Sequence, residues 1–113
     1  MTEDSAQQSI QQLLRRLGAT ENYAGFFPTV YAVQLSMADP ERLRLITKLI
    51  YLDVAWRYST TWKAVERNMR TLISVIWRNN PLLLSELAGF HLDRKPNNAS
   101  FLAIVAGSCA KNV

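Results

Sequence analysis

One stretch of the chain decides the fold: residues 62–78 read WKAVERNMRTLISVIWR. On an α-helix, which turns about 100° per residue, its basic side chains gather on one face and its aliphatic side chains on the opposite face. The basic face holds Lys63, Arg67 and Arg70, together with Ser74. The pattern predicts an amphipathic helix whose outer face is cationic.

A short helix and a tight turn precede this stretch. Residues 52–58 are predicted to be helical, and Ser59, Thr60 and Thr61 then interrupt the pattern. Each of the three hydroxyls can cap the next helix, and the sequence leaves the choice open. Two helices joined in this way are typical of a helix-turn-helix, in which the second helix enters the major groove of DNA.

Capping signals divide the rest of the chain. Asp39 and Asn80 each precede a proline, and each is predicted to cap the helix that the proline opens. Between residues 40 and 58 the sequence leaves open one long helix or two short ones broken near Tyr51. The predicted helices are residues 7–17, 25–37, 40–58 as one or two, 62–78, 81–88 and 101–106.

No stretch of the sequence shows the alternation of a strand or the signal of a hairpin turn. We therefore expect an all-α fold, a compact bundle of about six helices that contains a helix-turn-helix. The chain is expected to form a single domain over residues 1–113, with residues 1–6 and 108–113 as frayed tails.

The net charge of the chain is concentrated beside the predicted helix-turn-helix. Residues 57–78 hold five of the 13 Lys and Arg residues and one of the nine acidic residues, which accounts for the whole formal net charge of +4. A cationic face also keeps an ordinary amphipathic helix in solution. The gathering of all the net charge in one window favours a polyanionic partner, duplex DNA.

Other residue patterns exclude most catalytic functions. The four glycines are too far apart to cradle a nucleotide phosphate, and His91 has no second His or Cys at metal-ligand spacing. No His lies near a Ser or Thr to activate it, so we expect no enzyme, no metal and no cofactor. The lone Cys109, the absence of a secretory signal and the lack of a long uncharged run indicate a cytoplasmic protein that does not span a membrane.

The predicted DNA contacts fall into two groups. Arginine can donate to both O6 and N7 of guanine, so Arg67 and Arg70 are expected to read bases. Glu66 can accept from a cytosine amine or orient Arg70, four residues on. Contacts to the DNA backbone or at the helix start are expected from Arg57, Thr60, Thr61, Trp62, Lys63, Arg78 and Lys95.

The three tryptophans are assigned from their positions. Trp56 and Trp77 are expected to pack in the core. Trp62 belongs to the exposed first turn of its helix, where it can touch a sugar or a thymine methyl, or mark a protein interface.

The same residues carry a resemblance to a known family. The run from Val65 to Arg70, followed by Val75-Ile76-Trp77, resembles the recognition helix of the DNA-binding effector domain of stage zero sporulation protein A, a response regulator that starts endospore formation. The similarity extends from about residue 14 to residue 106. It includes residues 46–51, 53, 55, 89–90, 95–96 and 101–103.

The resemblance implies a six-helix effector domain that binds short DNA boxes as tandem copies and regulates transcription, with RNA polymerase as a further partner. It also implies that Arg67, Arg70 and Glu66 face the groove. The chain departs from the family at Ala64, where the family has another arginine, and at Trp62 and Lys63, which replace small residues. No receiver domain fits in 113 residues, so we expect an excised effector domain or a stand-alone relative.

A rival hypothesis is a protein-interaction module. Such a domain would pair with a full-length regulator and modulate transcription without binding DNA itself. Trp62, the missing receiver domain and the loss of an arginine at Ala64 favour this hypothesis.

Overall fold

The computed structural model describes the backbone of residues 3–111 and the side chains of residues 5–110. Over residues 3–111 it contains six α-helices and no strand, which confirms the predicted all-α class. None of these helices is long and apolar enough to cross a bilayer. In chain order the elements are α1 (Glu3–Arg16), α2 (Phe26–Ala38), the 3-10 helix η1 (Pro40–Leu45), the π-helix η2 (Thr47–Tyr51), α3 (Leu52–Arg57), α4 (Trp62–Asn79), α5 (Pro81–Ala88) and α6 (Asn98–Lys111).

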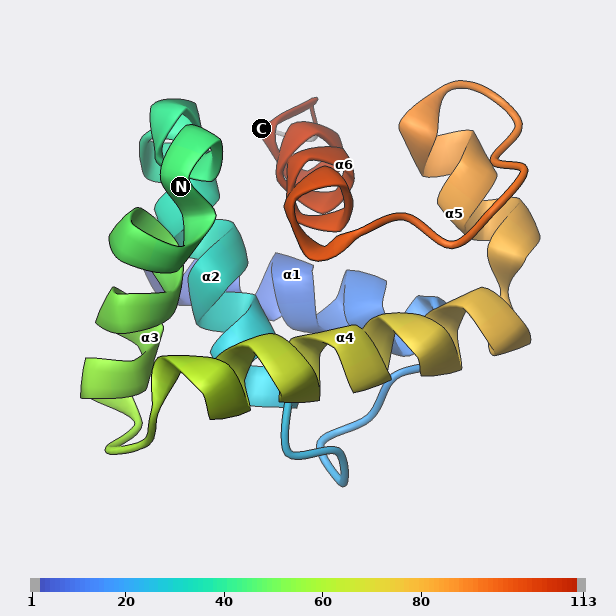
Figure 1. The fold of residues 1–113 in the computed structure, drawn as a ribbon. Coiled ribbons are helices and arrows are strands. Elements are labelled where there is room, and N and C mark those ends of the chain that lie inside the picture. Colours follow the sequence, from blue (N-terminus) through green and yellow to red (C-terminus); the bar gives the residue numbers. More distant parts are fainter. Residues whose placement is uncertain (1–2, 112–113) are drawn as a thin grey trace.

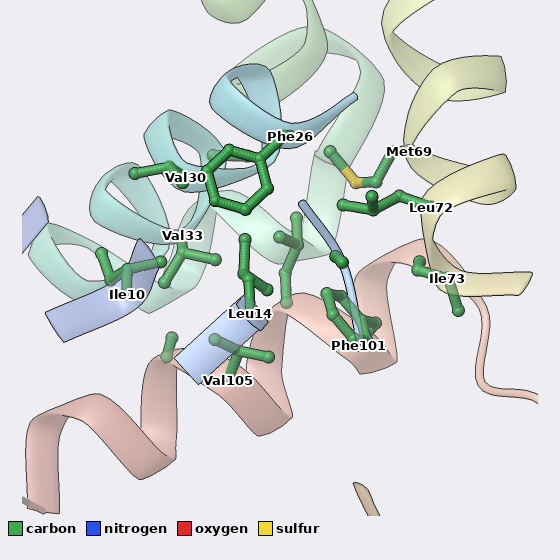
Figure 2. Packing of buried hydrophobic residues seen from close by; sticks show 14 of the residues in the cluster. Ile10, Leu14, Phe26, Val30, Val33, Met69, Leu72, Ile73, Phe101 and Val105 are labelled. Carbon is green, nitrogen blue, oxygen red and sulfur yellow. The ribbon is translucent and has the colours of Figure 1, made fainter. Parts of the chain in front are cut away.

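Helix α4 lies along one side of the molecule, with α3 at its N-terminal end and α5 after its C-terminal end (Figure 1). The core forms between α4 and the helices α1, α2 and α6, where Leu14, Phe26, Leu72 and Phe101 are fully buried (Figure 2). Each such side chain contributes about 1.5–3 kcal/mol on burial. The aliphatic side of α4 is therefore held inward, and its basic side faces away from the core.

The run from residue 40 to residue 57 is neither one regular helix nor two separated ones. It passes without a break from the 3-10 helix η1 to the π-helix η2 and then to α3. The π-helical segment contributes Ile50 and Tyr51 to the core. Arg42 ties the three segments together, because its guanidinium donates to the carbonyl oxygen of Leu49 (2.8 Å) and to the carboxylate of Asp53 (2.7 Å).

The predicted end of the last helix at residue 106 is wrong. Asn97 caps α6 by accepting a hydrogen bond from the backbone N–H of Ser100 (2.8 Å), so the helix begins three residues earlier than expected. It continues through Gly107 to Lys111, because the apolar spacing extends to the buried Cys109. Residues 3–6 and 108–111, predicted as frayed tails, are helical, and residues 1–2 and 112–113 lie outside the described residues.

Candidate nucleic-acid interface

A four-residue turn fixes the angle between α3 and α4. The backbone N–H of Thr60 donates to the carbonyl oxygen of Ala55 (2.9 Å), and Ser59 takes the left-handed conformation with φ 53°. Thr61 is the cap of α4, since its hydroxyl oxygen accepts from the N–H of Ala64 (3.1 Å). The sequence had left this choice among three hydroxyls open, and nothing in it indicated a left-handed serine.

The two faces of α4 separate as the sequence predicts. Its inner face buries Val65, Met69, Leu72 and Ile76. Its outer face exposes the side chains of Lys63, Arg67, Arg70 and Arg78. We call this outer side the cationic face of α4.

Arg67 and Arg70 lie in different surroundings on the cationic face. The guanidinium of Arg70 donates to the carboxylate of Glu66 (2.9 Å), and the Arg70 side chain remains 56% exposed. Arg67 has no hydrogen bond or ion pair with any described residue, and its side chain is exposed. Arg70 is thus oriented before any partner arrives, whereas all five N–H donors of Arg67 are open to solvent or to a ligand.

The segment before α6 brings a further cation onto this face. The ammonium of Lys95 donates to the hydroxyl oxygen of Ser74 (2.8 Å), and the Ser74 hydroxyl donates to the carbonyl oxygen of Arg70 (3.1 Å). Lys95 is 21 residues from Ser74 in the chain. The sequence includes Lys95 among the backbone contacts, and the structure places it directly beside α4.

A buried hydrogen-bond network holds the same flank of α4. The side-chain amide of Asn98 donates to the Tyr51 hydroxyl oxygen (2.9 Å) and to the carbonyl oxygen of Glu66 (3.1 Å). Burial raises the pKa of the Tyr51 hydroxyl above its usual value, so this group stays neutral. Asn98 and Tyr51 therefore fix η2 and α6 against α4, and neither residue was identified from the sequence because they lie 47 residues apart.

The other predicted backbone contacts lie near the two ends of α4. Thr60 is exposed in the turn, and Trp62 is 38% exposed with the ammonium of Lys63 at 5.8 Å from its ring centroid. The Arg57 guanidinium stacks over the ring of Tyr31 at 4.6 Å, which directs it toward α2. Arg57 is thus separated from the line of basic side chains on α4.

The core assignment of Trp56 is wrong, because its side chain is 87% exposed. The buried residues of α3 are Val54 and Ala55, and the side chain of Trp56 lies on the exposed side of this helix. The assignment of Trp77 is confirmed, since it packs half-buried against the core.

The remaining reactive side chains do not form a site. His91 is exposed, with Nε2 3.6 Å from the carboxylate of Asp93. Cys109 is buried, and burial raises the pKa of its thiol. Among the described residues no three His, Cys, Asp or Glu side chains gather as metal ligands.

A known family model matches most of the chain. The family model described as "Sporulation initiation factor Spo0A C terminal" matches residues 10–109 of the 113 residues. The matched range begins inside α1 and ends inside α6, so it includes α3, the turn and α4.

Proposed function

Because this chain belongs to the Spo0A C-terminal family, a family of DNA-binding sporulation regulator domains, we propose that α4 enters the major groove of duplex DNA. In this proposal α3 and α4 act as a helix-turn-helix, and Arg67 and Arg70 read bases. Glu66 holds Arg70 in position or accepts from a cytosine amine.

The observation that supports this proposal is the cationic face of α4. The face is built on a helix whose other side is locked into the core, so the arginines project from a rigid support. A helix of 18 residues with one basic, solvent-facing side is of a size that the major groove admits. Two arginines one turn apart can reach neighbouring base pairs.

The contacts to phosphates are assigned by position. Lys63 and the hydroxyls of Thr60 and Thr61 lie at the start of α4, where free N–H groups also favour an anion. Trp62 lies in the first turn of α4, and Arg78 lies near the C-terminal end of the helix. Arg57 is directed toward α2, and Lys95 is held by its hydrogen bond to Ser74. By analogy with the family, the proposal also includes a second copy on an adjacent DNA box and RNA polymerase as a downstream partner.

A second candidate function is favoured by one observation. Four apolar side chains at spacings of four, three and four residues are exposed along η1, η2 and α3: Leu45, Leu49, Leu52 and Trp56. Exposed apolar residues grouped on one helical face are typical of protein interfaces. They support a domain that pairs with another regulator instead of contacting DNA.

Selection from a random pool of duplexes separates the two functions. The proposed DNA reader should enrich a short common sequence, and a duplex carrying it should bind more tightly than its scrambled version. A chain that enriches no sequence and shifts no duplex in a gel would contradict the proposal. Sedimentation of the same preparation with a full-length regulator of this family would then show a stable complex if the interaction module is correct.

A further inference from the structure

A surface hollow with several polar side chains borders α4 on the side away from the segment that carries Lys95. It has a volume of about 370 Å³ and lies between the α1–α2 loop and the turn before α4. Tyr23 comes from the loop, Thr60 from the turn and Asn68 from α4 itself. In Figure 1 the loop passes beneath α4, on the side opposite to α6. The hollow is therefore built partly from α4 and partly from a distant segment.

The loop is fixed tightly to α4. Gly25 lies so close to the helix backbone that a Cβ on it would be 2.4 Å from the carbonyl oxygen of Asn68. Beside this contact, the Tyr58 hydroxyl of the turn donates to the carbonyl oxygen of Phe27 at the start of α2 (3.3 Å). Because the contact is with backbone atoms of α4, the position of the hollow relative to the cationic face is set by the fold.

The hollow and the segment that carries Lys95 lie on opposite flanks of the cationic face, and the Lys95 ammonium reaches from its flank onto the face at Ser74. Asn98, three residues after Lys95, contacts α4 at the carbonyl of Glu66, and Gly25 approaches α4 at Asn68. Residues two positions apart on an α-helix, such as Glu66 and Asn68, are separated by about 200° of rotation about the helix axis. A helix lying in a major groove has one DNA strand on each side, so each flank faces a different strand.

The hollow offers three neutral polar side chains. The Tyr23 side chain is 37% exposed, and its hydroxyl, the Thr60 hydroxyl and the Asn68 amide form no hydrogen bond with any described residue. The single acid lining the hollow is Glu21, whose carboxylate accepts from the guanidinium of Arg15 at 2.6 Å. These are donors suited to a phosphate oxygen, in a place where the one carboxylate is already paired with a guanidinium.

We propose that the Tyr23 and Thr60 hydroxyls bind a phosphodiester of the DNA strand on this flank, opposite the strand contacted by Lys95. This inference rests on the proposed function and extends it to the α1–α2 loop. The two flanks then differ in chemistry, because Lys95 is a cation and the hollow offers neutral donors. Neutral donors displace no condensed counterion, so they add affinity without adding to its salt dependence.

The test is Tyr23→Phe in the full chain, measured by fluorescence anisotropy on the selected duplex and on its scrambled version. Losing one hydrogen bond to a charged oxygen should weaken binding to both duplexes by roughly ten- to a hundredfold. The slope of log affinity against log salt should stay at the wild-type value. Tyr31→Phe is the matched control, because it removes a hydroxyl from α2 outside the hollow, keeps the ring beneath the Arg57 guanidinium, and should leave both affinities unchanged.

Three results would overturn the inference while leaving the proposed function intact. Tyr23→Phe could bind as tightly as the wild type, could weaken only the selected duplex, or could change the salt slope. Thr60→Val is a second test: it should weaken both duplexes and leave the salt slope unchanged. Its melting temperature is compared with that of the wild type to show that the variant is folded. If the wild-type chain itself binds no duplex, the proposed function fails first and this inference falls with it.

Discussion

At the scale of single residues, Arg67 and Arg70 differ more than their shared face suggests. Arg70 is tethered to Glu66 four residues earlier, and such an exposed pair stabilises a helix by only about 0.2–0.5 kcal/mol. The tether therefore orients Arg70 and is weak enough for Arg70 to exchange the carboxylate for a base edge in the proposed complex. Arg67 has no tether and can reach its partner without breaking a contact.

Replacing Arg67 and Lys63 should have different effects on DNA binding. Arg67→Ala should lower the affinity for the selected duplex by about tenfold, because a bidentate contact to guanine contributes roughly 1–3 kcal/mol of discrimination, and it should change the scrambled duplex less. Lys63→Ala should weaken both duplexes equally and make the salt slope shallower by about 0.9. Anisotropy titrations of both variants on both duplexes measure these effects.

Arg67→Lys serves as the matched control for charge. It keeps the cation and should keep most of the salt slope, but it cannot present the planar fork of donors and should lose selectivity as Arg67→Ala does. If Arg67→Ala and Lys63→Ala prove indistinguishable on the two duplexes, the assignment of base reading to Arg67 is wrong.

At the scale of elements, α4 was the easiest helix to predict. Its observed end at Asn79 is one residue beyond the prediction, because the apolar period, the threonine cap and the asparagine cap of α5 are all local signals. The succession of 3-10, π and α helices before the turn was not predictable. The exposed Trp56 was also missed, because the sequence does not show which residues of a six-residue helix are buried.

The two flanks of α4 could not be derived from the sequence either. Lys95 meets Ser74, Asn98 meets the carbonyl of Glu66, and Gly25 packs on the backbone of Asn68. Each contact joins segments that are adjacent only after the core has formed. The cationic face could thus be predicted residue by residue, whereas its borders required the fold.

Thr61 connects the stability of α4 to its function. Thr61→Ala should lower the free energy of unfolding by about 1 kcal/mol, because the N–H of Ala64 loses its cap. Thr61→Asp should keep the cap and the stability, since aspartate is an equally good capping residue. Urea unfolding followed by tryptophan fluorescence measures both variants.

The same pair of variants also tests the placement of DNA. Thr61→Asp puts a carboxylate where a phosphate is proposed to lie, so it should weaken binding to every duplex despite its normal stability. A stable Thr61→Asp variant with wild-type affinity would place the DNA backbone elsewhere.

At the scale of the whole molecule, the fold gathers a modest excess of positive charge on one side of the protein. The formal net charge of +4 is small, but the cations of α4 share one outward face, and Lys95 is brought to it from the segment before α6. Elsewhere acids and bases offset each other, as in the ion pairs of Arg15 with Glu21 and Arg42 with Asp53. Such a distribution steers a polyanion toward one side of the protein.

The salt dependence of binding to the selected duplex tests this picture most directly. If about four cations engage phosphates, the slope of log affinity against log salt should be roughly −3.6. An anisotropy titration of the wild-type chain at several salt concentrations gives this slope. A value near −3.6 is the expected result, and an affinity that does not change with salt would contradict DNA binding through the cationic face of α4.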